Sequence, residues 1–245
     1  MSDEERKSID FPLLCFFFMI VPRMFGWLSR VICPRRKYST ISRVFTNDSC
    51  SRLQDMLQDV SKEGGLKIES LASRFDTLQF RPLIKSFHFS KIGYLPLLEV
   101  ENFTLCMFYI PLGKALPFHN HPDQHVLQRV VFGELEITSF DIHGRSKIEP
   151  GQVYTPDDNS WNDTVVTCKD SSMIVRPDQA NIHRIRATRK DHGALFMDLV
   201  FPPYNSEHSI VYFEDIGDGT VKSLRERDVF IDMELVGPEK FFQHP

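Results

Sequence analysis

From about residue 95 onward the chain is divided into short apolar runs, and this rhythm constrains the fold more than any other feature. The runs are rich in Val, Ile, Phe and Tyr, and Pro, Gly, Asp and Asn separate them. Regularly spaced short strands of this kind are typical of an antiparallel barrel or sandwich. In ELEITSFD, polar and apolar residues alternate as in a half-buried strand. The sequence therefore predicts an all-β fold. The runs are FTLCMFYIPLG, VLQRVVFGELEITSFD, GQVYTP, WNDTVVTC, SSMIVRPD, HRIRAT and ALFMDLVFPP.

One helix is expected before this β-rich part. Four apolar residues recur at helical spacing, Asp48 or Ser49 can cap the start, and Gly64-Gly65 can end it. The spacing predicts an amphipathic helix over residues 49–63 and no other strong helix. We expect one domain over residues 46–245, preceded by an extension over residues 1–45. The four apolar residues are Leu53, Met56, Leu57 and Val60.

The composition of the N-terminal extension indicates a possible targeting segment. Its apolar stretch, Phe11 to Val21, is shorter than the roughly 20 residues that a spanning helix needs, so we expect no stable membrane span. Between Phe11 and Asn47 there are basic but no acidic residues, together with Ser and Thr, as in a mitochondrial transit peptide. The acidic start, MSDEER, is atypical. A secretory signal and a plain extension remain alternatives, and we expect a mitochondrial or cytoplasmic protein.

Overall composition excludes some classes of partner. The formal net charge is -4, so the chain lacks the basic excess of a nucleic-acid-binding protein. Its 5 cysteines are scattered and include no C-x-x-C pair, which argues against a disulfide framework and a zinc ribbon. A small ligand and a reducing compartment fit better.

Three histidines form a candidate metal site. His119 and His121 lie two residues apart in HNHPDQH, next to a probable strand. Side chains at this spacing on an extended segment point to the same side, so both imidazoles can face one point inside a barrel. His183, at the end of a later strand-like segment, can supply a third neutral donor. Three imidazoles leave coordination positions open, which is typical of a catalytic metal site.

The segment GKALPFHNH resembles the first cupin motif, in which a Gly precedes the H-x-H and another Gly, here Gly133, closes the next turn. Most cupins add a Glu ligand soon after the H-x-H, but this chain has His125 and Val126 there. The run as far as SFD, with NIHRIRA and MDLVFPPY, resembles the cysteamine (2-aminoethanethiol) dioxygenase and plant cysteine oxidase family. This resemblance covers roughly Leu97 to Phe213 and implies a cupin, that is, a double-stranded β-helix or jelly-roll barrel.

The resemblance also implies an activity. Members of this family are non-haem iron dioxygenases, so the implied cofactor is Fe(2+), held by His119, His121 and His183. The implied reaction uses O2 to convert cysteamine to hypotaurine, or the N-terminal cysteine of a peptide to cysteine sulfinic acid, and it can serve oxygen sensing. Asp198 and Tyr204 stand where the family has a carboxylate and a tyrosine near the substrate. The resemblance favours a monomer.

Alternatives remain open at the level of single residues. Asp198 could instead be a strand-end carboxylate paired with an arginine, and the string PPY a rigid turn. His125 could line the substrate pocket, support a ligand or face solvent. Some animal members link a cysteine to a tyrosine two residues later, and the equivalent residues here are Ile210 and Tyr212, which cannot form that link. A metallo-cupin acting on a non-thiol metabolite and a non-catalytic ligand-binding cupin are the alternative functions.

Overall fold

The computed structural model describes residues 40–60, 67–84, 89–141, 153–155, 162–189, 191–204, 210–216, 224–226 and 231–243. The possible targeting segment lies largely outside these ranges. Among the helices within these ranges, none is long and apolar enough to cross a bilayer.

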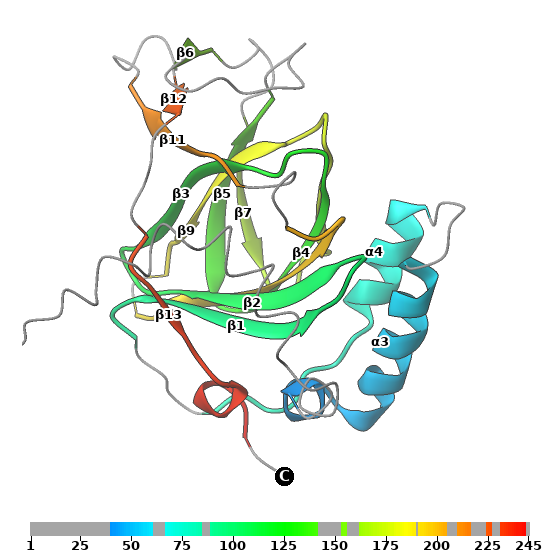
Figure 1. Cartoon of the computed structure of the whole chain (residues 1–245). Coiled ribbons are helices and arrows are strands. Elements are labelled where there is room, and N and C mark those ends of the chain that lie inside the picture. The colour runs from blue at the N-terminus through cyan, green and yellow to red at the C-terminus, as the bar shows by residue number, and fades with distance from the viewer. Residues whose placement is uncertain are drawn as a thin grey trace, which may run out of the picture.

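Helices α3 and α4 precede the strands and pack beside them (Figure 1), and residues 40–44 before them are also helical. Helix α3 spans Asn47–Val60, so it begins two residues before the predicted start. Thr46 lies at its start, where its hydroxyl accepts the backbone N–H of Ser49 at 3.4 Å. The Ser49 hydroxyl instead accepts the Gln79 N–H at 2.7 Å. The predicted stop at Gly64-Gly65 lies outside the described residues.

The prediction of a single strong helix is wrong, because helix α4 spans Ile68–Asp76. This helix has only 9 residues, so its apolar repeat extends over few positions of the sequence. It buries only Leu71, Ala72 and Phe75, and helices of this length depend on tertiary packing for most of their stability. All three residues belong to the same core cluster as the buried face of α3.

The strands form two sheets that face each other (Figure 1). Neighbouring strands are antiparallel, except that β13 is parallel to β1. The first sheet has the order β13 (Met233–Leu235), β1 (Ile92–Glu99), β2 (Thr104–Ile110), β10 (Ala194–Phe201), β4 (His125–Phe132) and β8 (Met173–Val175). The second has the order β6 (Val153–Tyr154), β12 (Leu224–Glu226), β11 (Tyr212–Asp215), β3 (Ala115–Asn120), β9 (Ile182–Ala187), β5 (Glu134–Phe140) and β7 (Asn162–Thr167). A short 3-10 helix, Pro238–Lys240, follows β13.

From β2 to β5 and again from β7 to β11, successive strands alternate between the two sheets, which is the winding of a jelly roll. The passage from β4 to β5 consists of Gly133 alone, with φ +81°. A Cβ atom there would lie 2.6 Å from the Gly193 carbonyl oxygen, so glycine is required. The expected all-β cupin barrel with a helical N-terminal region is confirmed.

Alternation along the strands of the first sheet separates an outer face from the barrel interior. On β10, Met197 and Leu199 belong to the core cluster shared with the helices. Phe196 points to the opposite side of the strand from Met197 and packs with residues of the second sheet such as Ile185. This second cluster fills one end of the barrel with apolar side chains. Asp198 follows the interior alternation of Phe196, so it faces into the other end.

Candidate metal centre

Two of the three candidate ligands face each other across neighbouring strands. His119 on β3 is the direct partner of His183 on β9, and their ring centroids are 4.4 Å apart. The pairing shifts register between Leu116 and His119, next to Pro117. Proline lacks the N–H of a regular ladder and is tolerated at such irregularities. Both rings are buried between the two sheets.

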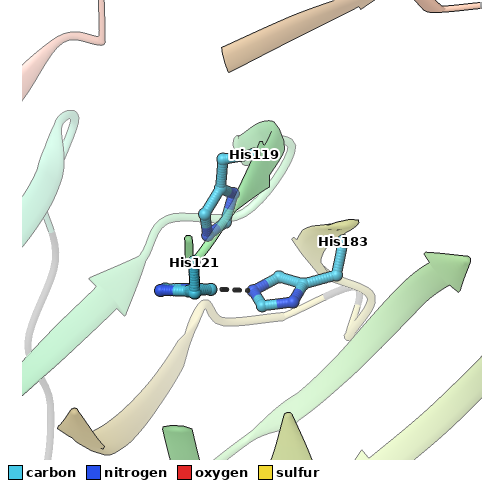
Figure 2. Close-up of side chains that lie close together, drawn as sticks. All are labelled: His119, His121 and His183. Atoms are coloured by element: carbon cyan, nitrogen blue, oxygen red, sulfur yellow. Dashed lines mark hydrogen bonds between the residues drawn. The ribbon is translucent and has the colours of Figure 1, made fainter. Parts of the chain in front are cut away.

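His121 completes the cluster from the position just after the end of β3. Its Nε2 atom lies 3.4 Å from His183 Nε2, and Figure 2 shows the three rings converging on one region. The potential ligand atoms all lie within 4.8 Å of one another. Three nitrogens at about 2.1 Å from one ion are roughly 3–3.5 Å apart, so small ring movements suffice to bind a metal.

Hydrogen bonds orient two of the rings. His119 Nδ1 lies 2.8 Å from the Pro117 carbonyl oxygen. Because a carbonyl can only accept, Nδ1 carries the proton and the Nε2 lone pair is free. His121 Nδ1 lies 3.0 Å from the Tyr204 hydroxyl. A metal on His121 Nε2 requires a proton on Nδ1, which then donates to Tyr204. His183 Nδ1 is buried without a well-directed hydrogen bond among the described residues.

Burial keeps these imidazoles neutral. It lowers the pKa of His119 to about 4, partly offset by the Pro117 carbonyl. Burial, followed by the nearby His183 and His119, holds the pKa of His121 well below its usual value. His183 is lowered in pKa by burial and then by His119, with a smaller opposing effect of the Ala180 backbone. Neutral imidazoles present the lone pairs that a metal needs, so the donor set fits a metal ion.

The interior face of the first sheet supplies a carboxyl group to the same end of the barrel. Asp198 on β10 lies between Cys106 on β2 and Gln128 on β4, which are its direct cross-strand partners. Gln128 Nε2 donates to Asp198 Oδ1 at 3.1 Å. The alternative of an arginine-paired strand-end carboxylate is wrong, because Asp198 is buried within β10 and pairs with this amide. Burial raises the pKa of Asp198 to about 7, and Gln128 lowers it in part.

Two tyrosines flank the histidine cluster. Tyr204, near the end of the β10 segment, contacts His121 and packs on the cluster of Val126, Val175 and Val200. Burial, and then the charges of Cys106 and Asp198, raise the pKa of its hydroxyl well above the usual value. Tyr212 on β11 lies opposite His119, with ring centroids 5.9 Å apart. Burial raises the pKa of Tyr212 to about 12, so both hydroxyls are neutral at pH 7.

His125 is not part of the metal-binding group. It begins β4, and its ring stacks on Phe201 with centroids 5.5 Å apart and an interplanar angle of 10°. Burial and then Arg176 lower its pKa. The structure therefore places His125 beside the end of β10, whereas the described metal group contains His119, His121 and His183.

Gln128 and Cys106 are interior residues that the sequence alone does not single out. Both lie among largely apolar residues on the inward alternation of their strands, where a polar residue is the available signal. Burial, and then Asp198, raise the pKa of the Cys106 thiol well above the usual value. At Ile210 and Tyr212 the chain has no cysteine to link to the tyrosine.

Comparison with known proteins agrees with the resemblance. The family model PCO_ADO matches residues 57–231, more than half of the chain. A "Probable 2-aminoethanethiol dioxygenase" of Dictyostelium discoideum is 35% identical over 118 residues, which are 47% of this chain and 51% of that protein. "Plant cysteine oxidase 2" of Arabidopsis thaliana is 25% identical over 193 residues, 75% of this chain and 67% of that protein. This chain spans about half to two thirds of the length of these relatives.

Solved structures with similar topology are more distant. A cupin protein of the RmlC-like type from Desulfovibrio desulfuricans is 17% identical over 49% of this chain and 91% of that chain, with a TM-score of 0.32. A protein with a double-stranded β-helix domain from Klebsiella pneumoniae is 15% identical over 48% of this chain and 75% of its own, with a TM-score of 0.33. These scores are low, so the description of the barrel rests on the strand order.

Proposed function

This chain belongs to the PCO_ADO family, and on that premise we propose that it is an iron-dependent thiol dioxygenase. The observation that carries the proposal is the donor set, three buried neutral imidazoles without a carboxylate. An Fe2+ ion held by these histidines would keep its positive charge and supply a centre at which a thiolate and O2 meet. The thiol R–SH and one O2 give the sulfinic acid R–SO2H, with both oxygen atoms on sulfur.

The proposed substrate carries an amine two carbons from its thiol. Cysteamine and an N-terminal cysteine share this 2-aminoethanethiol unit. Asp198 is a buried carboxyl group, and no salt bridge joins it to a basic side chain in the described part of the chain. An ammonium group would supply the missing cation and favour the ionised carboxylate. Asp198 therefore binds the substrate amine in this proposal.

Tyr204 supports the site from behind His121. When Nε2 faces the metal, the Tyr204 hydroxyl accepts a hydrogen bond from His121 Nδ1–H, which fixes the orientation of that ring. Tyr204 also lies near enough to Asp198 for the carboxylate charge to raise the pKa of the hydroxyl. The tyrosine therefore connects the metal end of the site with its amine-binding end.

Oxygen uptake tests this proposal. Full-length protein with measured iron content would be given cysteamine or, separately, a short peptide beginning with cysteine. We expect iron-dependent uptake and a mass gain of two oxygen atoms on at least one substrate, absent in His121→Ala. The two arms distinguish the free thiol from the peptide. Bound iron without uptake in either arm would instead favour a metallo-cupin reaction on a non-thiol metabolite, and the absence of bound metal would contradict the proposal.

A further inference from the structure

Gln128 lies in the barrel interior, where an amide side chain needs a polar partner. It is 3% exposed, and its neighbours in the inward alternation of β4, Val126 and Val130, are apolar and buried. Its partner is Asp198, the residue directly opposite on β10, through the bond of 3.1 Å between Nε2 and Oδ1. Both residues are held by regular strand pairing, so their relative position is set by the backbone.

The surroundings of Asp198 leave this hydrogen bond as the main described interaction that favours its charged form. The charge of Asp198 acts on two titratable groups of neighbouring elements, the Cys106 thiol on β2 and the Tyr204 hydroxyl. Burial raises the pKa values of both groups well above their usual ranges, so both are neutral at pH 7. Gln128 donates the one hydrogen bond described for the Asp198 carboxyl oxygens. A hydrogen bond from an amide to a carboxylate favours its charged form.

We propose that Gln128 is a positioning residue, which fixes the Asp198 carboxylate and thereby sets the affinity of the site for the ammonium end of its substrate. The choice of substrate rests on the proposed function above. Gln128 binds Asp198 Oδ1, which leaves Oδ2 to accept from the ammonium group. Gln128 therefore acts through Asp198 and determines selectivity for aminothiols over thiols without an amine.

Steady-state kinetics of the iron-loaded full-length enzyme test this role. In Gln128→Leu we expect KM for the preferred aminothiol to rise about 5- to 30-fold, with kcat within about threefold of the parent. The acidic limb of the kcat/KM profile should move to higher pH, because the lost N–H no longer favours the carboxylate. For 2-mercaptoethanol, which has no amine, KM and kcat should each change less than about twofold. An equal loss for both thiols would overturn the proposal.

A double-mutant cycle separates positioning from general disruption of the core. In an Asp198→Asn background, Gln128→Leu should lower kcat/KM by less than about twofold, because the group through which it acts is gone. Additive losses would contradict the proposal. Gln128→Asn keeps the amide but is too short to reach Asp198, so it should raise KM in the same way. It replaces Gln128→Leu if the leucine variant folds poorly. Gln243→Leu is a matched control, since Gln243 Nε2 donates to the Leu83 carbonyl at an exposed site.

A titration of the metal-free protein tests the same bond without any activity. Carbon-13 labelling of aspartate side chains, with Asp198→Asn for assignment, gives the titration midpoint of Asp198. The midpoint should rise in Gln128→Leu and stay unchanged in Gln243→Leu. An unchanged midpoint in Gln128→Leu would overturn the positioning role, whatever the protein oxidises. A raised midpoint in a protein that consumes no O2 with any aminothiol would support the bond and contradict the proposed function.

Discussion

At the scale of the residue, the histidine cluster depends on side chains that hold the rings as well as on the rings themselves. His121 offers a ligand atom directly, whereas the Tyr204 hydroxyl contacts only Nδ1, the other ring nitrogen of His121. Loss of a ligand should therefore weaken metal binding more than loss of a supporting partner. The first removes a bond to the metal, and the second allows the ring to rotate and makes it a weaker donor.

Replacing a ligand should abolish metal binding. We expect His121→Ala to retain less than about a tenth of the iron of the parent protein, because two imidazoles leave a much weaker site. Metal analysis after anaerobic loading and desalting measures this. His192→Ala is the matched control, since His192 lies beside Phe132 with ring centroids 4.6 Å apart and outside the metal group. Full iron content in His121→Ala would show that the ion binds elsewhere.

Replacing the supporting tyrosine should weaken metal binding without abolishing it. Tyr204→Phe removes the hydroxyl from His121 Nδ1, and changes of this kind typically cost 10- to 100-fold in metal affinity. Competition with a metal chelator measures the dissociation constant. Tyr109→Phe provides the comparison, because the Tyr109 hydroxyl interacts with the Gly193 backbone instead of with a histidine. Equal affinities in Tyr204→Phe and the parent would exclude the supporting role.

The carboxyl group should make the stability of the metal-free protein depend on pH. Because burial raises the pKa of Asp198 to about 7 in the folded state, folding favours its protonated form. Stability from this source is present at low pH and is lost as the pH rises toward 7. Asp198→Asn should therefore gain roughly 2–3 kcal/mol over the parent between pH 5 and pH 8. Urea unfolding at both pH values measures the difference in stability, with Asp55→Asn at an exposed position of α3 as the control. A gap independent of pH would contradict the shifted pKa.

At the scale of the element, one arginine fastens the helical region to the barrel. Arg129 on β4 donates from Nη1 to the carbonyl oxygens of Phe75 and Leu78, both at 2.8 Å. These carbonyls lie at and just after the end of α4, where backbone acceptors lack helical partners. The guanidinium also lies 5.3 Å from the centre of the Phe80 ring. A charge is favourable here because it meets the negative end of the helix.

Removing this contact should destabilise the whole domain. Arg129→Leu removes the donor described for the partly buried Leu78 carbonyl and leaves the Phe75 carbonyl with only the Leu78 N–H at 3.3 Å. We therefore expect a loss of about 2–4 kcal/mol in the free energy of unfolding. Urea denaturation provides the measurement. The exposed ion pair of Arg186 with Glu136 offers a contrast, and Arg186→Leu should cost less than about 1 kcal/mol. A similar loss of unfolding free energy in both variants would show that the contact to α4 stabilises the domain no more than an exposed ion pair does.

At the scale of the whole molecule, the three ligands come from segments that must be folded to meet. His119 and His183 are brought together by the pairing of β3 with β9, across a separation of more than 60 residues. An unfolded chain holds no such cluster, so a metal that binds here stabilises the folded state. The apolar filling at the opposite end of the barrel and the helices outside the first sheet keep this geometry in place.

Metal binding should therefore raise the melting temperature. At a free metal concentration about 100 times the dissociation constant, the gain is about 2.7 kcal/mol. For a domain of this size that corresponds to roughly 5–10 °C. Calorimetry with Co2+, which avoids oxidation of iron during heating, measures the shift. His121→Ala should show almost none of it. An equal shift in His121→Ala would contradict binding at the three histidines.

The sequence by itself determined the features that depend on local pattern. Alternating residues predicted most of the strands, and the H-x-H spacing with His183 indicated the ligands, because side-chain direction repeats every two residues in a strand. Helix α4 was missed because it is only 9 residues long, so its apolar repeat covers few positions.

Only the tertiary structure decided which distant residues meet. The bond between Gln128 and Asp198 joins residues 70 positions apart, and the contact of Arg129 with Phe75 joins residues 54 positions apart. The local sequence pattern does not predict the register between strands that are remote in the chain. A shift of one residue would turn Gln128 away from the interior. The proposed amine-binding end of the candidate site therefore depends on the packing of β2, β4 and β10.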